Sequence, residues 1–323
     1  MSDTNKLLLQ SSPHMTSSVD STALMRNMLI ALAPVSVYGI VIFGLPALLN
    51  IVVAVAAAIA GESLFRLVLK RPIRAKDLSA GVSGLLLALI LPPTTPLWMT
   101  ALGAVFAIVV AKEFFGGLGA NVFNPALIGR AFLLMSFPAA LTTWRLPGQP
   151  WGASAADVIT GATPLGIARM GGSSDTALMN LFFGFHGGSI GETSIFLILA
   201  ACVFLLLTKT IDWRTPVCMI TSGAAAAFAL GLDPLFSVLS GGLVFGAVFM
   251  ATDYVTGSVT RKGKVIFGIG AGIIAMLIRK WGVYPEGVSY AILIMNGVTP
   301  FLDKLMSKKY GFVKQNKDKG AAK

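Results

Sequence analysis

The sequence predicts an all-α integral membrane protein with about ten transmembrane helices, and three observations support this fold class. Of the 323 residues, 55% are hydrophobic and only 12% are charged, whereas a soluble domain carries about 25% charged residues. Uncharged runs long enough to cross a bilayer, which takes about 20 apolar residues, recur along the chain. Shorter runs interrupted by Gly or Pro occupy comparable places in the two halves, as in transporters built from inverted repeats.

The first half consists of a polar tail and five predicted crossings. Residues 1–26 lack the basic flank and adjoining apolar core of a signal peptide, so we expect a retained cytoplasmic tail. Residues 27–61 are uncharged, and the stretch Gly44-Leu45-Pro46 divides them into two helices. Residues 78–111 are again uncharged, and the proline-rich stretch 92–96 divides them. A fifth segment over residues 121–140 completes a first membrane repeat, residues 27–141.

A long mixed stretch, residues 142–192, separates this repeat from the second. It is rich in Gly, Ser, Thr and Asp and has no apolar run long enough to span. Five further segments follow near residues 193–208, 215–232, 234–252, 265–278 and 287–303, and they form a second membrane repeat over residues 193–306. Residues 307–323 are a basic tail, which we expect to be solvated near anionic lipid.

Two of these segments are too short to cross a bilayer. Leu78–Leu91 and Val265–Ile278 each hold 14 residues, which suggests broken or half-crossing helices. The glycines at 116–119 lead into the sequence NPA at 124–126, and those at 241–242 lead to ATD at 251–253. Because these echoes lie at comparable places in each half, they favour an inverted repeat with a site near the midplane.

The distribution of basic residues predicts the orientation. Of the 25 Lys and Arg residues, 20 fall on the side of the chain termini, four fall on the opposite side, and Arg130 lies within the fifth segment. The positive-inside rule therefore places both termini in the cytoplasm and residues 142–192 outside. The net charge of +11 lacks interleaved aromatic residues, so it indicates lipid contact and orientation and not nucleic-acid binding.

Few residues could hold a metal or a nucleotide. Cys202 and Cys218 lie in apolar runs without a CxxC motif, and the only histidines are His14 and His186. An intramembrane bis-His haem, a His-rich metal site and an iron–sulfur cluster held by this chain alone are excluded, because a cluster normally needs four thiolates. The glycines at 116–119 lack the strand–turn–helix context of a dinucleotide site, so we expect NAD to bind elsewhere.

The stretch DVITGATPLG, residues 157–166, is unusual in so apolar a chain. By spacing alone it is a Gly-centred turn in an exterior loop. The longer pattern Asp157-x-x-Thr160-Gly161-Ala162-Thr163 fits D-x-x-[ST]-G-A-[ST], which average residue usage would produce about once in a thousand chains of this length. A hydroxyl preceded by Gly and Ala leaves room for a modifying enzyme and a phosphate to approach.

This motif resembles the covalent flavinylation site of the RnfD/NqrB family, the larger membrane subunits of the Rnf complex and of the sodium-pumping NADH:quinone oxidoreductase. Residues 12–14, 116–132, 191–194 and 249–253 also resemble that family and cover most of the chain in order. The compact N-terminus is most similar to the D subunit of Rnf. The resemblance implies that a flavin transferase links FMN through its phosphate to the hydroxyl of Thr163.

The resemblance also implies a fold and partners. The fold would be two inverted five-helix repeats like those of urea transporters. The chain would be an electron-transfer subunit in the cytoplasmic (inner) membrane, with Thr163 on the extracytoplasmic side. It would assemble with other membrane subunits, a second flavinylated subunit and iron–sulfur subunits, and the complex would couple ferredoxin:NAD electron transfer to Na⁺ or H⁺ translocation. The coupling ion and a second, non-covalent flavin such as riboflavin are left open.

Two rival functions come from other classes. A passive solute channel or transporter is one, because the sequence NPA at 124–126 is similar to the aquaporin signature, although a water channel should have two copies. A purely structural membrane subunit is the other. A covalent flavin, which fluoresces in a denaturing gel, is expected from neither rival.

Several polar residues inside the predicted repeats have open roles. Arg130 could bind a flavin phosphate or a backbone carbonyl at a broken helix, or it could form a structural pair with a carboxylate, since membrane-embedded charge is costly. We expect Asn121 and Asn124 to cap the fifth helix and Glu192 to favour the start of the sixth.

Glu113 and Asp253 are candidates for an ion pathway. Each lies where an uncharged run ends at a glycine-rich break, and intramembrane carboxylates near unwound backbone are common sites of cation passage. The alternative is that each simply ends a helix at the interface, which Lys112 beside Glu113 favours.

Overall fold

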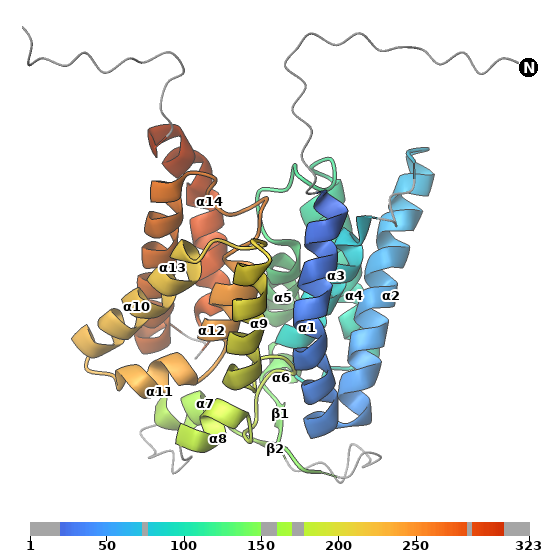
Figure 1. The fold of residues 1–323 in the computed structure, drawn as a ribbon. Coiled ribbons are helices and arrows are strands. Elements are labelled where there is room, and N and C mark those ends of the chain that lie inside the picture. Colours follow the sequence, from blue (N-terminus) through green and yellow to red (C-terminus); the bar gives the residue numbers. More distant parts are fainter. Residues whose placement is uncertain (1–19, 73–76, 150–159, 170–177, 283–285, 307–323) are drawn as a thin grey trace, which may run out of the picture.

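The computed structural model describes residues 20–72, 77–149, 160–169, 178–282 and 286–306. This part of the chain is a bundle of helices, as the composition predicts (Figure 1). The first half contains α1 (Ser21–Phe43), α2 (Leu45–Val68), α3 (Ser79–Ile90), α4 (Leu97–Ile108), the π-helix η2 (Val109–Glu113), α5 (Pro125–Ser136) and α6 (Pro138–Leu141).

Short elements connect the two halves. They are the strands β1 (Trp144–Arg145) and β2 (Thr160–Gly161) and the helices α7 (Pro164–Arg169) and α8 (Leu178–Phe183). The strands pair antiparallel, with Trp144 opposite Gly161 and Arg145 opposite Thr160. Figure 1 shows these elements at one end of the bundle, while α1 begins and α14 ends at the other.

The second half is also helical. It contains α9 (Ile195–Leu207), α10 (Arg214–Ala229), α11 (Pro234–Leu239), α12 (Leu243–Phe245), the π-helix η3 (Gly246–Met250), α13 (Arg261–Trp281) and α14 (Val288–Met306).

The predicted divisions of the two long apolar runs are confirmed. Gly44 separates α1 from α2 and has φ 75°, a left-handed conformation that glycine adopts without steric cost. Pro46 follows in the first turn of α2, where its missing N–H is not needed. The proline-rich stretch 92–96 likewise separates α3 from α4.

Two predicted segments are wrong in length. The run 265–278 was expected to be a short helix, but α13 extends to 21 residues because Thr260 caps its start and charged side chains occupy both ends. Long basic side chains can lie along a helix end and keep their charge in water. Conversely, the segment 234–252 is not continuous, because Gly241, with φ 66°, breaks it into α11 and a second piece formed by α12 and η3.

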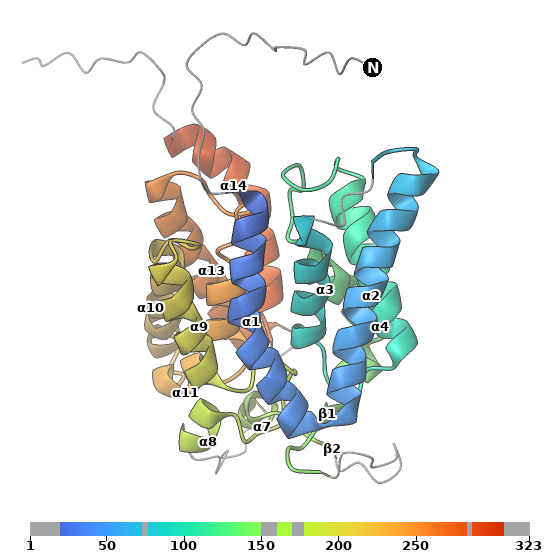
Figure 2. The same cartoon turned by 45° about the vertical axis from the view of Figure 1, so that its right-hand side comes forward.

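The same packing pattern occurs in both halves. In the first half α2 packs against α4 and α4 packs against α5; in the second half α10 packs against α13 and α13 packs against α14. The halves meet through α1 with α9 (Figure 2) and through α5 with α14. The short pieces α3 and η3 lie inside this arrangement, and their side chains are almost all buried.

Close approach of α13 to α10 depends on small residues. A Cβ on Gly268 would lie 2.7 Å from the carbonyl oxygen of Thr215, and one on Gly272 would lie 2.1 Å from the hydroxyl of Ser222. Gly268 and Gly272 form a G-x-x-x-G pattern, which lets two helix backbones approach closely in membranes.

Two of the described helices, α1 and α2, are long and apolar enough to cross a membrane by length and composition. Their outer faces carry exposed aliphatic side chains such as Val37 (59% exposed) and Val52 (55% exposed). At 1.5 Å per residue, the 12-residue helix α3 spans only about 18 Å. It is therefore too short to cross a bilayer by itself, as its short apolar run predicted.

Candidate functional site

Thr163 is positioned by a strand and a helix. β2 ends at Gly161, and α7 begins with Pro164 directly after Thr163. The Thr163 hydroxyl accepts a hydrogen bond from the Gly166 N–H at 3.1 Å, and the Thr163 carbonyl accepts from Ile167. Thr at the N-cap with Pro at the next position is a favoured start for a helix. The motif therefore builds a defined turn, and Thr163 is only 7% exposed.

Two motif residues are less fully described. Asp157 lies outside the described residues. The backbone of Thr160 pairs with Arg145 in the two-stranded ribbon. A Cβ on Gly161 would lie 3.1 Å from the Leu146 side chain, so Gly161 lets this ribbon pack closely.

A cavity of about 230 Å³ opens beside Thr163. One part of its wall is apolar and comes from α5, α6, β1 and α14: Ala131, Leu134, Leu141, Trp144 and Tyr290. The other part is polar: Arg130, Thr142, Glu286 and Ser289. A cavity with one apolar wall and a few converging polar groups is the usual form of a small-molecule or cofactor site.

Arg130 lies in the polar wall and is held by two carboxylates. It donates hydrogen bonds to a Glu286 carboxylate oxygen and, at 2.9 Å, to the Ser289 hydroxyl. The Glu192 carboxylate is 3.7 Å away. The structure thus brings Arg130 and Thr163, which are far apart in sequence, to the same cavity. It also shows that Arg130 is paired with carboxylates, which was one of the alternatives expected for it.

Three polar residues, Asn121, Asn124 and Glu192, were expected to act at the starts of the fifth and sixth helices. Asn124 caps α5, because its side chain accepts from the Ala126 and Leu127 N–H groups. Asn121 does not cap it and instead donates to the Phe123 carbonyl. Glu192 lies two residues before Ser194, which caps the sixth helix, α9, and the Glu192 carboxylate is paired with Arg130.

Sequence reasoning missed the partners of Arg130. Glu286 lies in the short connection between α13 and α14, and Ser289 lies in the first turn of α14. The only available signal was that a buried arginine requires a carboxylate or comparable acceptor. Nothing in the local sequence identified which of the acidic residues would supply it.

Arg130 is not the sole basic residue buried within helices, contrary to the sequence prediction. Arg66 was assigned to the loop after the second helix, but it lies inside α2 and is buried. Lys112, in η2, is also buried. The Lys112 ammonium contacts Glu62 at 2.9 Å, and the Arg66 guanidinium contacts Glu113 at 3.0 Å. We call these four residues the α2–η2 charge cluster.

Glu113 is the last residue of η2, so it does end a helix, but its side chain is buried in the cluster. The π-helix η2 carries it into the cluster, and Gly117, with φ 95°, turns the chain away directly afterwards. A Cβ on Gly117 would lie 2.7 Å from the Arg66 guanidinium. The absence of this Cβ gives the cluster its space.

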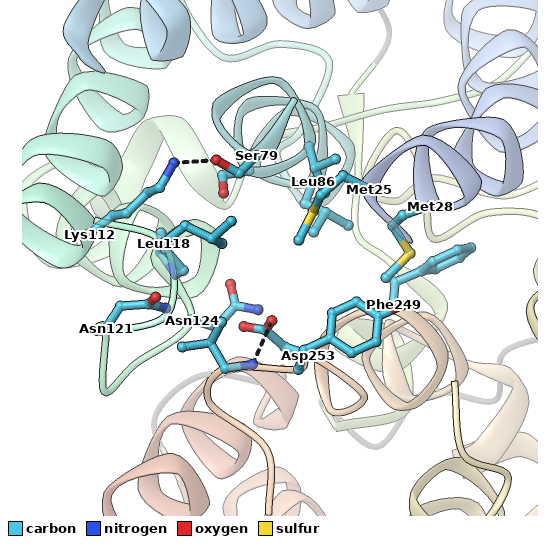
Figure 3. A pocket seen from close by; sticks show the side chains of 15 residues that line it. Met25, Met28, Ser79, Leu86, Lys112, Leu118, Asn121, Asn124, Phe249 and Asp253 are labelled. Carbon is cyan, nitrogen blue, oxygen red and sulfur yellow. Dashed lines mark hydrogen bonds between the residues drawn. The ribbon is translucent and has the colours of Figure 1, made fainter. Parts of the chain in front are cut away.

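Asp253 lines a second cavity, of about 50 Å³, between the two halves of the molecule. Its carboxylate accepts from the Thr256 hydroxyl at 2.9 Å and from the Val255 N–H at 3.4 Å. Figure 3 shows the side chains of Asn124 and Asp253 directed into this cavity, with Met25, Met28 and Phe249 on another part of its wall. Lys112 also lines the cavity and donates to Ser79. Lys112, a member of the α2–η2 charge cluster, thus lines the same cavity as Asp253, whereas Glu113 does not line it.

Comparisons with known proteins agree over nearly the whole chain. A sequence model of the NQR2, RnfD, RnfE family matches residues 8–311. The chain is 43% identical to the D subunit of the proton-translocating ferredoxin:NAD(+) oxidoreductase complex of Clostridium ljungdahlii, over 93% of this chain and 94% of that protein. It is 41% identical to the D subunit of the Na(+)-translocating ferredoxin:NAD(+) oxidoreductase complex of Acetobacterium woodii, over 97% and 98% respectively. It is also 41% identical to the D subunit of the ion-translocating oxidoreductase complex of Stutzerimonas stutzeri, over 95% and 96%.

Proposed function

The chain belongs to the NQR2, RnfD, RnfE family, and on this basis we propose that it is the D subunit of an Rnf-type complex. Such a complex couples electron transfer between ferredoxin and NAD to ion translocation across the membrane. Relatives that carry this name align with more than nine-tenths of the chain. Within the complex, this chain is a membrane electron-transfer subunit, and NAD binds to another subunit.

The cofactor of this subunit is FMN, joined through its phosphate to the Thr163 hydroxyl. The observation that supports this proposal is that Thr163 and Arg130 share one cavity of about 230 Å³. A phosphoester on Thr163 adds negative charge, and a guanidinium matches phosphate oxygens in a bidentate geometry. When bound, the flavin supplies the electron-carrying group, and the apolar wall formed by Leu134, Leu141 and Trp144 would shield it from water.

The residues around Thr163 suit attachment by a separate flavin transferase. Ala162 is exposed beside the nearly buried Thr163. The Thr163 hydroxyl oxygen accepts from Gly166, and an ester oxygen can still accept that bond. The modification therefore does not require α7 to unfold.

The orientation follows from the positions of the chain ends. α1 begins and α14 ends at one end of the bundle, and α7 lies at the other (Figure 1). Together with the excess of basic residues near the termini, this supports cytoplasmic termini and an extracytoplasmic Thr163 in the inner membrane. The repeated packing of α2–α4–α5 and α10–α13–α14 supports two related repeats of the kind expected for a urea-transporter-like fold.

The coupling ion is Na⁺ or H⁺, and relatives of nearly equal identity are named for each of the two. Asp253 is our candidate for the ion pathway because its carboxylate lines the cavity between the halves. Glu113 is paired with Arg66, so any contribution that it makes to ion translocation acts through the α2–η2 charge cluster. The partners are the remaining Rnf subunits, including a second flavinylated subunit and iron–sulfur subunits.

The test of this function is the covalent flavin. The purified chain should fluoresce in a denaturing gel, and peptide mass spectrometry should place one FMN on the peptide that contains Thr163. Thr163→Ala should abolish the fluorescence while the protein remains in the membrane, whereas Thr163→Ser should retain part of it because the linkage needs only a hydroxyl. Fluorescence that persists in Thr163→Ala, or that maps to Thr160, would show the assignment to be wrong.

Native mass spectrometry of the same sample addresses a second, non-covalent flavin such as riboflavin. The cavity in Figure 3 offers amide, carboxylate and aromatic groups from Asn121, Asn124, Asp253 and Phe249. Its volume of about 50 Å³ means that neighbouring side chains would have to move to admit a flavin. A chain that carries no flavin at all would favour the passive channel or transporter instead.

A further inference from the structure

A third cavity lies on the other side of α7 from the Thr163 cavity. It has a volume of about 370 Å³ and is enclosed by α7, α11 and the end of α13. α7 separates the two cavities: Gly166 lines the one beside Thr163, whereas Leu165 and Arg169 line this one. We call it the α7–α11–α13 cavity. The flavin proposal makes no use of it.

A buried arginine with an unused donor forms part of its wall. Arg279 is 6% exposed and donates through its two terminal nitrogens to the carbonyl oxygens of Ser237 and Ser240. Its Nε is also buried and has no hydrogen-bond partner among the described residues. A buried N–H without an acceptor is costly, so negative charge in the adjoining cavity would be favoured.

Two exposed basic residues complete the wall. Lys280 donates to the Leu230 carbonyl, and Arg169 donates to the Gly282 carbonyl. The single acidic residue of the described lining, Asp233, accepts from the backbone N–H groups of Leu235 and Phe236 and so caps α11. Three cations and one carboxylate leave the cavity with positive charge.

Exposed apolar side chains lie close in sequence to residues that line the cavity. Phe228, at the end of α10, is 77% exposed, and Leu235, in α11, is 54% exposed. Phe236 contributes an aromatic side chain to the cavity itself. A basic pocket beside exposed apolar side chains at a helix end is suited to a lipid whose phosphate enters the pocket while its acyl chains follow the outer surface.

We propose that the α7–α11–α13 cavity binds a phosphate oxyanion, supplied by an anionic phospholipid headgroup of the leaflet on the Thr163 side. The Lys280 ammonium and the Arg169 guanidinium, both exposed, contact the phosphate, and the buried guanidinium of Arg279 adds positive charge in the wall behind them. Bound lipid would fix α7, and with it the turn that carries Thr163, against the second half of the molecule.

The test uses the purified full chain, delipidated in an uncharged detergent, with short-chain phosphatidylglycerol, short-chain phosphatidylcholine and inorganic phosphate as separate probes. Binding is followed by native mass spectrometry. Arg169→Gln/Lys280→Gln removes two exposed cations and leaves Arg279 to hold the α11 carbonyls. The matched control, Arg261→Gln/Lys262→Gln, removes two exposed cations from the opposite end of α13.

We expect phosphatidylglycerol to bind the unmodified chain and the control alike, and to bind the Arg169→Gln/Lys280→Gln variant roughly thirtyfold more weakly. If inorganic phosphate binds with the same variant dependence and phosphatidylglycerol does not, the oxyanion site stands with free phosphate as its source. Equal binding of phosphatidylcholine and phosphatidylglycerol, or undiminished binding by the variant, would overturn the proposal. Should the double variant fail to fold, Lys280→Gln alone repeats the test at an exposed position.

Discussion

Arg130 is the cationic partner of buried carboxylates and also lines the cavity beside Thr163. Its guanidinium is shared by Glu286 and Glu192, so one cation serves two carboxylates at the polar wall. A phosphate on Thr163 would add a further negative group to the same cavity. We therefore expect Arg130 to matter both for folding and for holding the flavin phosphate.

Arg130→Met should destabilise the protein by roughly 3–5 kcal/mol, because it leaves buried carboxylates without their cation. Adding Glu286→Gln should recover part of this loss, since it removes one of the two stranded charges. The thermal midpoint of each detergent-solubilised variant measures the effect. If Arg130→Met melted at the same temperature as the unmodified chain, the ion pair would not contribute to folding.

Asp253 and Glu113 should behave differently, although the sequence places both at comparable breaks. Asp253 lines a cavity and is held by a hydroxyl and a backbone N–H, so Asp253→Asn should keep assembly and bound flavin but lose ion uptake. Glu113→Gln removes the partner of buried Arg66 and should lower the thermal midpoint. Uptake by the complete complex in proteoliposomes, driven by the redox reaction, is the measurement. Normal uptake in Asp253→Asn would remove that residue from the pathway.

Two glycines with positive φ form the turn that follows η2. Gly117 and Gly119 follow η2, and both have φ 95°, a conformation that an L side chain adopts only at a cost of roughly 1–2 kcal/mol. Their surroundings differ. A Cβ on Gly117 would meet the guanidinium of Arg66, whereas a Cβ on Gly119 would meet nothing within 4 Å.

This pair provides a matched comparison for the turn after η2. Gly119→Ala should lower stability by roughly 1–2 kcal/mol, from backbone strain alone. Gly117→Ala should lower it further, because the new methyl group displaces Arg66 from Glu113. Thermal midpoints of the two variants report the difference. Equal midpoints would mean that the α2–η2 charge cluster accommodates the methyl group without loss.

At the scale of the whole molecule, the two ends of the bundle differ in chemistry. One end has the start of α1, the end of α14 and the α2–η2 charge cluster nearby. The opposite end has the ribbon β1–β2 and α7 (Figures 1 and 2). Residues of α7 line both the Thr163 cavity and the α7–α11–α13 cavity. A flavin on Thr163 would therefore lie at the end of the bundle opposite the start of α1 and the end of α14.

Reporter fusions test this orientation in cells. A reporter inserted after residue 163 should be active only when it is extracytoplasmic, and one at residue 320 should be active only in the cytoplasm. The expected result is opposite sidedness, because five predicted crossings, an odd number, lie between residue 163 and residue 320. Both reporters on the same side would require a different number of crossings and would overturn the assignment of residues 142–192.

The sequence by itself determined the features that depend on composition and on neighbouring residues. The low charged fraction indicated a membrane protein, Gly44 and the proline-rich stretch 92–96 located the helix divisions, and Asn124 was identified as a cap. The family was also identified from short motifs. Each of these signals acts within a few residues, where helix capping, turn geometry and apolar runs are decided.

Only the tertiary structure decided which distant residues meet. The pairs Arg130–Glu286 and Arg66–Glu113 each join segments that are far apart in the sequence. A buried charge indicates that a partner is needed but does not indicate which residue supplies it. The length of α13 was misjudged because apolar-run length omits charged side chains that extend from a helix end. The cavity beside Thr163 also required the fold, since its walls come from α5, α6, β1, α7 and α14. Packing between distant segments determines these features, and local sequence does not encode it directly.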